Sequence, residues 1–148
     1  MNWRSLMNTQ IVASETIDQL FPEVDILSPS GYLTAVRAGL SGDKLRIITK
    51  FIGDRELVAR SIGKDASNLS RSYRVKLLPP AVTDNLIDTV RVYLQAAQIY
   101  DSMELAKEWM NSPIPSLGGE IPATLLDTHA GRELVRQTLR KMEYGEYV

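Results

Sequence analysis

The sequence of 148 residues contains no cysteine and only one histidine. Without cysteine there can be no disulfide, no thiolate nucleophile and no cysteine-ligated metal site, which favours a cytoplasmic protein. Long apolar runs are missing too, since no stretch approaches the roughly 18 residues that a membrane span needs. Residues 1–10 lack the apolar core and cleavage site of a signal peptide. We therefore expect neither secretion nor a membrane anchor.

The residue patterns of common enzyme sites are absent as well. There is no glycine-rich phosphate loop and no Gly-x-Ser-x-Gly elbow. The carboxylates do not cluster at the spacings of metal ligands. The single histidine, His129, follows Thr128 at a predicted helix start and is interpreted as a capping-region residue. The sequence therefore predicts no enzymatic activity, no metal and no cofactor.

Apolar spacing predicts an all-α fold. Hydrophobic residues make up 44% and charged residues 24%, which is typical of a globular protein. The strict alternation of a β-strand does not occur, whereas spacings of three and four recur throughout. Proline, glycine and capping residues then divide the chain into predicted helices over about 14–20, 29–38, 43–51, 55–62, 66–73, 80–100, 103–110 and 128–144.

Charge is unevenly distributed along the chain. Residues 1–36 carry one basic and four acidic groups, a net charge of −3. Residues 37–91 carry eleven basic and six acidic groups, a net charge of +5. Residues 92–148 carry five basic and eight acidic groups, again −3. A basic middle between acidic ends indicates that only the middle meets an anionic partner.

Residues 55–74 in this basic middle have the layout of a helix-turn-helix. Ala59 is small where a second helix would cross, Gly63 falls in the turn, and Leu69 would lock the second helix inward. The other face offers groups that can contact phosphates or base edges, and the predicted DNA-binding residues are Lys64, Ser67, Asn68, Arg71, Ser72 and Arg74.

Two of these residues depart from the usual helix-turn-helix pattern. Lys64 stands where an apolar residue is common, and Ser72 stands where another core residue is often found. The alternative interpretation is a purely structural helical pair with a solvated polar face. The local positive charge favours DNA, because neutralising phosphates supplies most non-specific affinity.

The C-terminal third of the chain holds the most specific pattern. A helix ending at Trp109 is followed by the connector Pro115-Ser116-Leu117-Gly118-Gly119-Glu120-Ile121-Pro122, and then by Leu125-Leu126-Asp127-Thr128 and Gly131. This arrangement resembles the C-terminal signature of the MbcA/ParS/Xre antitoxin family, and the resemblance extends over roughly residues 39–148. Ile114 departs from it, since family members commonly have Asn there.

The resemblance implies a function and a partner. Such antitoxins pair with RES-domain toxins, which degrade NAD, and obstruct the toxin's active-site cleft with their C-terminal region. They commonly repress their own operon through the helix-turn-helix. We predict three parts of the chain: an N-terminal extension (1–38) that lies outside the resemblance and is a candidate dimer surface, a helix-turn-helix module with a long linking helix (39–100), and a toxin-binding module (101–148). A homodimer within a larger toxin–antitoxin complex is expected, because one short recognition helix reads too few base pairs of an operator.

The last predicted helix suggests where a toxin would be held. Arg132, Arg136 and Arg140 are spaced four residues apart and are interpreted as a cationic ridge opposite the helix's apolar residues. Like charges at this spacing cost an isolated helix a few tenths of a kcal/mol. The predicted toxin-binding residues are therefore this ridge and the tail: Arg132, Arg136, Arg140, Tyr144, Glu146, Tyr147 and Val148. The alternative is a solvated arginine face with a frayed end.

Two other functions fit the same sequence. The first is a stand-alone helix-turn-helix transcriptional regulator that senses a ligand through its C-terminal part. The second is an interaction adaptor whose helix-turn-helix has lost DNA binding, with Lys64 and Ser72 as its signs. An adjacent gene for a RES-domain protein would favour the antitoxin, and salt-dependent binding to promoter DNA would argue against the adaptor.

Overall fold

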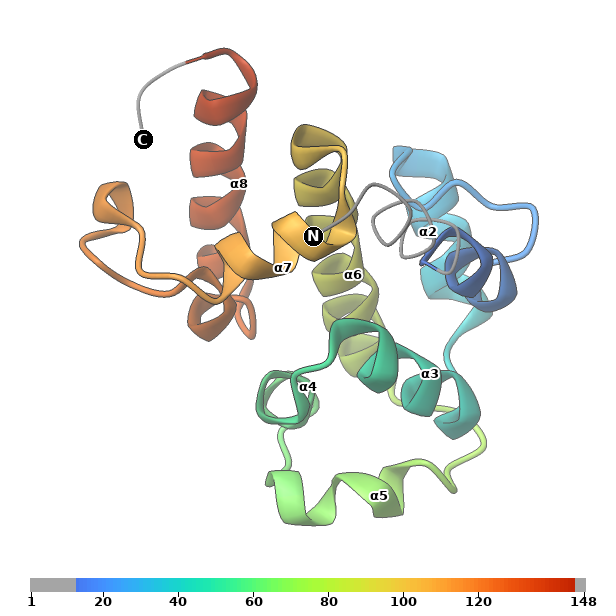
Figure 1. The fold of residues 1–148 in the computed structure, drawn as a ribbon. Coiled ribbons are helices and arrows are strands. Elements are labelled where there is room, and N and C mark those ends of the chain that lie inside the picture. Colours follow the sequence, from blue (N-terminus) through green and yellow to red (C-terminus); the bar gives the residue numbers. More distant parts are fainter. Residues whose placement is uncertain (1–12, 146–148) are drawn as a thin grey trace.

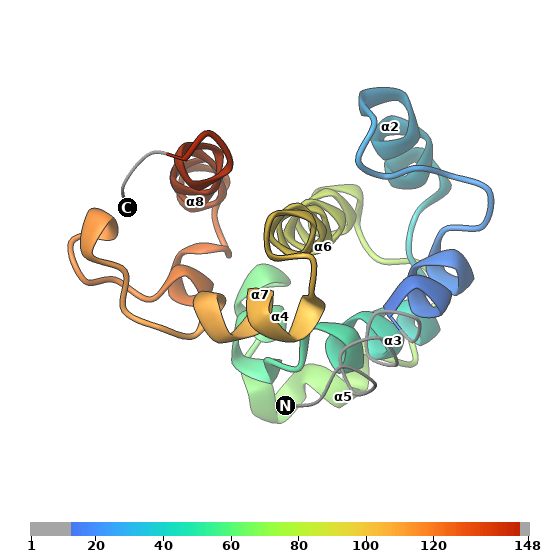
Figure 2. The same cartoon turned by 45° about the horizontal axis from the view of Figure 1, so that its top comes forward.

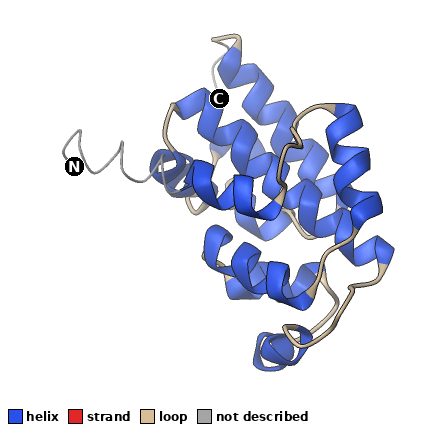
Figure 3. Cartoon of the chain, turned by 90° about the vertical axis from the view of Figure 1, so that its right-hand side faces the viewer, coloured by secondary structure: helices blue, strands red, loops and turns tan. Residues whose placement is uncertain are grey.

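The computed structural model describes residues 13–145 and contains no β-strand among them, which confirms the predicted all-α fold (Figure 3). The chain is helical over residues 13–20 and then forms α2 (Pro29–Ala38), α3 (Gly42–Ile52), α4 (Arg55–Ser61), α5 (Leu69–Ser72), α6 (Pro80–Tyr100), α7 (Met103–Met110) and α8 (His129–Glu143). Short 3₁₀ turns are η1 (Ala66–Asn68), η2 (Pro115–Leu117) and η3 (Pro122–Leu125).

Capping side chains explain where several helices begin. The Asp54 carboxylate accepts a hydrogen bond from the Leu57 N–H at 3.0 Å, which starts α4 as predicted. Thr128 accepts from the Gly131 N–H at 3.0 Å and starts α8. Each cap satisfies a backbone donor that the first turn leaves unpaired, a contribution of about 1 kcal/mol. The long helix α6 begins at Pro80, where a missing N–H costs nothing.

Helix α6 is the centre of the molecule. It contacts α2, α3, α4, α7 and α8. Figures 1 and 2 show α2 and α8 on opposite sides of it, with α3 to α5 gathered below in Figure 1. Leu86, Ile87 and Val90 are fully buried, so α6 is apolar around much of its circumference. Each such side chain contributes about 1.5–3 kcal/mol through burial.

The buried apolar residues between Leu20 and Leu139 form one continuous hydrophobic core, to which the described residues of all three predicted parts of the chain contribute. Polar contacts cross the predicted boundary near residue 100 as well. Arg60 of α4 donates to the Ala123 carbonyl at 3.4 Å, and Lys107 of α7 donates to the carbonyl of Phe51 in α3. The predicted helix-turn-helix and C-terminal segments are therefore packed on each other. Among the described residues, no helix combines the length and apolarity needed to cross a lipid bilayer.

Candidate functional site

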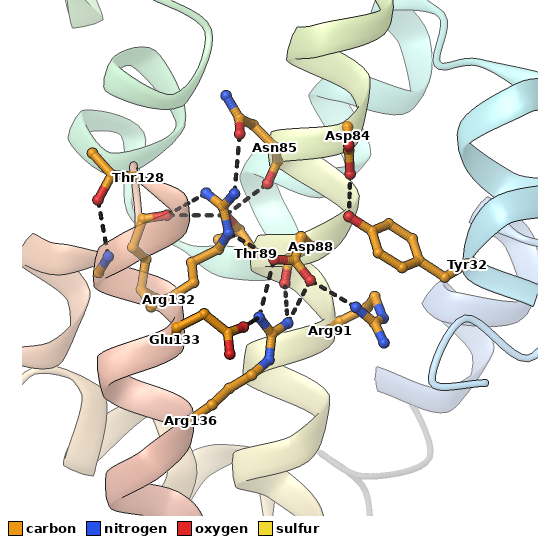
Figure 4. Close-up of polar contacts among 12 residues, drawn as sticks. Tyr32, Asp84, Asn85, Asp88, Thr89, Arg91, Thr128, Arg132, Glu133 and Arg136 are labelled. Atoms are coloured by element: carbon orange, nitrogen blue, oxygen red, sulfur yellow. Dashed lines mark hydrogen bonds and ion pairs between the residues drawn. The ribbon is translucent and has the colours of Figure 1, made fainter. Parts of the chain in front are cut away.

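A buried carboxylate lies at the contact between α6 and α8. Asp88 of α6 is 3% exposed. Its Oδ2 atom accepts hydrogen bonds from Arg132 Nε at 2.7 Å and from Arg136 Nη1 at 3.1 Å. Its Oδ1 atom accepts from Arg91 Nη1 at 2.8 Å and from Arg136 Nη2. Each carboxylate oxygen thus has two guanidinium donors, and three arginines surround one acid (Figure 4).

Other polar groups complete the surroundings of the two α8 arginines. Arg132 also donates to the Leu126 carbonyl at 3.0 Å and to Asn85 Oδ1 at 3.1 Å. Arg136 also donates to Glu133 Oε1 at 2.8 Å. We call this set the Asp88 cluster: Asn85, Asp88, Arg91, Arg132, Glu133 and Arg136. Sequence reasoning missed Asp88, and the available signal was a lone acid within the apolar run 86–90.

The contacts of the Asp88 cluster favour the charged forms of Asp88 and Arg136. Burial raises the pKa of Asp88, but the hydrogen bonds and positive charges of Arg136 and Arg132 outweigh it, so the pKa lies below its ordinary value. Burial lowers the pKa of Arg136, and its contacts with Asp88 and Glu133 raise it by more. Removing one partner of such a buried pair costs about 3–5 kcal/mol, because the other charge is left unpaired.

The predicted cationic ridge on α8 is wrong for two of its three arginines. Arg132 and Arg136 are 3% and 7% exposed, whereas Arg140 is exposed. Helical geometry gives the reason: Arg132 and Leu139 are seven residues apart, close to two turns of 3.6 residues, so they share the face that packs on α6. The acid that neutralises Arg132 and Arg136 lies on a different helix. Neither buried side chain is available to a partner.

The outer face of α8 carries a different set of side chains. Leu134 is 46% exposed and Tyr144, at the end of the helix, is 78% exposed. Gln137, Arg140 and Lys141 are exposed between them. We call these five residues the outer face of α8. Large apolar side chains left in water beside basic groups are a common feature of protein interfaces.

A groove of about 520 Å³ separates the C-terminal halves of α6 and α8. Its α6 side is formed by Gln95, Gln98 and Ile99, and its α8 side by Arg136, Leu139, Arg140, Met142 and Glu143. Arg136 spans the two sides by donating to Gln95 Oε1 at 2.9 Å. The mixture of amide, charged and apolar groups suits a polypeptide segment better than a small apolar ligand.

The glycine connector closes a tight loop before α8. Gly118 and Gly119 have φ angles of +66° and +83°, which other residues adopt only with strain. The Ile114 carbonyl accepts hydrogen bonds from the Leu117 and Gly119 N–H groups at 2.9 and 3.0 Å, and the Ile114 N–H donates to the Glu120 carbonyl at 3.1 Å. The side chain of Ile114 is buried, so an apolar residue suits this position although the family pattern has Asn there.

Gly131 of the motif is required for a different reason, which is close packing. A Cβ atom added to it would lie 1.7 Å from the Leu125 carbonyl oxygen. Only glycine therefore lets the first turn of α8 sit on the end of η3. The connector and this contact together set where α8 begins.

The six predicted DNA-binding side chains differ in their exposure to solvent. Gly63 has a φ angle of +70°, and Ala59 and Leu69 are buried, as the helix-turn-helix pattern requires. The side chains of Lys64, Ser67, Arg71 and Arg74 are exposed and that of Asn68 is half-buried. Ser72 is only 8% exposed, so a DNA contact from its side chain is contradicted. Its face packs toward the start of α3, where Gly42 lies against the carbonyls of Ser72 and Tyr73.

Contacts from two other arginines brace this helical pair. Arg55 at the start of α4 donates to the Ala66 carbonyl at 3.2 Å and to the Tyr73 hydroxyl at 3.3 Å. The Arg46 guanidinium lies 5.2 Å from the centre of the Tyr73 ring. Sequence reasoning did not single out Arg46 or Arg55. They hold the second helix in place and leave Arg71 and Arg74 free at its surface.

The tail prediction is only partly within the described residues. Tyr144 is exposed, whereas Glu146, Tyr147 and Val148 lie outside the described residues. His129 is exposed at the first turn of α8, consistent with its interpretation as a capping-region residue. Within residues 13–145, no group of histidine and carboxylate side chains is arranged to hold a metal ion.

Comparison with known proteins covers the C-terminal part of this arrangement. Residues 95–145 match the family described as the antitoxin Xre/MbcA/ParS C-terminal toxin-binding domain. This part of the chain is therefore similar to the toxin-binding domain of the Xre/MbcA/ParS antitoxins. The matched range contains the end of the groove-forming helix α6, the connector and α8. The resemblance predicted from the connector residues is thereby confirmed for residues 95–145. Residues 39–94 lie outside the match, so the upstream resemblance stays a prediction.

A curated relative points the same way. The Prs ADP-ribosylating antitoxin of Sphingobium sp. (strain YBL2) is 35% identical over 48 residues. The aligned residues make up 32% of this chain and 30% of that protein, so the similarity spans about a third of either. The residues that line the groove and those of the outer face of α8 all lie within the family match over residues 95–145.

Proposed function

We propose that this protein is the antitoxin of a type II toxin–antitoxin system and inhibits a RES-domain, NAD-degrading toxin by occluding its active site. One observation carries the proposal: all groove-lining residues and the whole outer face of α8 fall within residues 95–145, which match a toxin-binding domain family. The named relative is an ADP-ribosylating antitoxin. ADP-ribosyl transfer and NAD hydrolysis break the same nicotinamide–ribose bond. A partner toxin that consumes NAD is therefore consistent with the name of the relative and with the proposed NAD-degrading toxin.

The toxin-contacting surface proposed here differs from the arginine ridge. Arg132 and Arg136 are withdrawn from it, because their donors are committed to Asp88. Arg140 and Tyr144 stay, joined by Leu134, Gln137 and Lys141 on the outer face of α8. Glu146, Tyr147 and Val148, which lie outside the described residues, remain part of the proposed toxin-binding set. A pocket shaped for a dinucleotide suits the carboxylate of Glu146 and the aromatic ring of Tyr147.

Co-expression with the product of the neighbouring reading frame tests the proposal. The wild-type chain should relieve growth arrest and co-purify with that product. Leu134→Asp combined with Arg140→Glu should abolish both effects while the far-ultraviolet circular dichroism spectrum stays unchanged. Arg37→Glu, an exposed arginine in the last turn of α2, is the matched control and should neutralise as the wild type does. A neighbouring protein that is not toxic, or that fails to bind, would refute the antitoxin function.

We propose operator binding as a second activity. It is supported by the exposed basic side chains of Lys64, Arg71 and Arg74 around the second helix of the pair, in the segment of net charge +5. Autorepression, and a homodimer that presents two such helices, belong to this proposal. A gel-shift titration of the promoter against salt tests it. Promoter binding without any toxin gene nearby would instead favour the stand-alone regulator, and no shift at low salt would favour the adaptor.

A further inference from the structure

The Asp88 cluster joins three parts of the chain that lie far apart in sequence. Arg91 of α6, one turn after Asp88, donates through Nε to the Ile26 carbonyl at 2.7 Å. Its guanidinium lies 4.0 Å from the centre of the Tyr32 ring of α2, whose hydroxyl donates to Asp84. On the other side Arg132 and Arg136 bring in α8 (Figure 4). The N-terminal helices and α8 are therefore tied to one point on α6.

Within the described residues, every hydrogen bond and ion pair between α6 and α8 comes from Arg132 or Arg136. The rest of the contact is apolar, through side chains such as Val135 and Leu139. Apolar contacts tolerate small sliding movements, since they have no direction. The hydrogen bonds of a carboxylate whose two oxygens each accept two guanidinium donors are directional, and they do not tolerate such sliding movements. A shift of α8 by one turn, about 5.4 Å, would break all of these bonds.

We infer that Asp88 is a positioning residue that sets the register and angle of α8 on α6, and thereby the shape of the groove and of the outer face of α8. The inference about α8 stands on the structure alone, while its consequence for a toxin rests on the proposed function. The cluster adjoins the groove, because Arg136 both donates to Asp88 and lines the groove, so a small rotation of α8 at Asp88 changes the shape of the groove.

A buried ion cluster can add to the stability of the fold or fix the position of a helix, so the variants must distinguish these two roles. Asp88→Asn leaves arginines short of a counter-charge and should lower the melting temperature. The triple variant Asp88→Leu, Arg132→Met, Arg136→Leu removes the carboxylate and both α8 arginines together, and such replacements are often neutral or stabilising. Arg91 loses Asp88 in this variant and keeps the Ile26 carbonyl and the Tyr32 ring as partners. Asp84→Asn, one turn earlier on the exposed side of α6, is the matched control, because it removes one negative charge from α6 beside Tyr32 without touching α8.

The absence of cysteine allows a direct measurement of the position of α8. Spin labels on cysteines introduced at the exposed positions Lys50 of α3 and Gln137 of α8 report the distance between the two helices by double electron–electron resonance. The wild type and Asp84→Asn should give one narrow distribution. The triple variant should melt near the wild-type temperature and give a broadened or shifted distribution.

A stable triple variant with the wild-type distribution would overturn the inference, because the cluster would then contribute stability only. If the triple variant does not fold, Asp88→Glu decides, since it keeps the charge and lengthens the arm by one methylene. A displaced distribution for Asp88→Glu supports positioning, and an unchanged one refutes it.

The consequence for binding is measured with the co-expressed toxin. The triple variant should bind it about tenfold more weakly than the wild type, and Asp84→Asn should bind less than about twofold more weakly. Failure of the wild type to bind would refute the proposed function and leave the distance measurement to judge the inference.

Discussion

Two arginine-bearing helices of this protein look alike in sequence and differ in structure. Helix α8 carries Arg132 and Arg136 four residues apart, and the α4–α5 pair carries Arg71 in α5 and Arg74 just after the end of α5, three residues apart. The first two are buried against Asp88, whereas the second two are exposed. Arginine spacing alone therefore does not tell which helix presents charge to a partner. An acid on the neighbouring helix decides it.

The largest expected effect separates two arginines of the same helix. Arg132→Ala removes three hydrogen bonds and leaves Asp88 short of charge, so it should reduce the free energy of unfolding by about 3–5 kcal/mol. Arg140→Ala, eight residues later and exposed, should change it by less than about 0.5 kcal/mol. Urea denaturation followed by circular dichroism measures both. Equal reductions for the two variants would contradict the buried cluster.

Acid should break the same cluster without a mutation. The folded-state pKa of Asp88 is lowered, so its ion pairs stabilise fully above the ordinary aspartate value of about 3.9 and are lost as the pH falls through the lowered value. The melting temperature of the wild type should therefore fall steeply below about pH 4. The curve for Asp88→Asn should lack this component and converge on the wild-type curve at low pH. Parallel curves between neutral and strongly acidic pH would show that Asp88 does not titrate with folding.

What sequence reasoning predicts well is local. The starts of α4 and α8 follow from Asp54 and Thr128, whose side chains cap nearby N–H groups. The left-handed turn at Gly63 follows from the residue type. The resemblance around Leu117-Gly118-Gly119 locates the antitoxin-family region because a backbone constraint leaves a short, readable pattern.

Sequence reasoning misses the features that depend on contacts between residues far apart in the chain. Asp88 and Arg132 are 44 residues apart, and no periodicity within either helix reveals that they meet. The ridge prediction is wrong because it assigns Arg132 to the face opposite Leu139, although seven residues return almost to the same side of a helix. The prediction for Ser72 fails for a related reason: the backbone carbonyls of Ser72 and Tyr73 lie against Gly42 at the start of α3, and no pattern within residues 66–73 reveals that contact.

Smaller losses of stability are expected from substitutions at glycines with left-handed backbone conformation. Such glycines occur both before α8 and between α4 and α5, so the two regions can be compared again. Gly118 and Gly119 before α8 and Gly63 between α4 and α5 have positive φ angles and open space where a Cβ would lie. Alanine at any one of them should cost about 1–2 kcal/mol from backbone strain alone. Thermal melts of the three single variants measure it, with Ser116→Ala as the unstrained control. A cost at Gly118 well above that at Gly63 would mean that the connector carries strain of its own.

The smallest change in stability is expected where the proposed DNA contact lies. Arg71→Ala combined with Arg74→Ala removes two exposed side chains, so the free energy of unfolding should change by less than about 0.5 kcal/mol. Promoter affinity should nevertheless fall, and the slope of log K against log salt should flatten by about 0.9 for each phosphate that the variant no longer neutralises. Toxin neutralisation should be retained, because neither arginine lies near α8. The α4–α5 pair packs on the same core as the C-terminal helices, so this separation is a demanding test. A folded double variant that is defective in both activities would show that the two surfaces act as one.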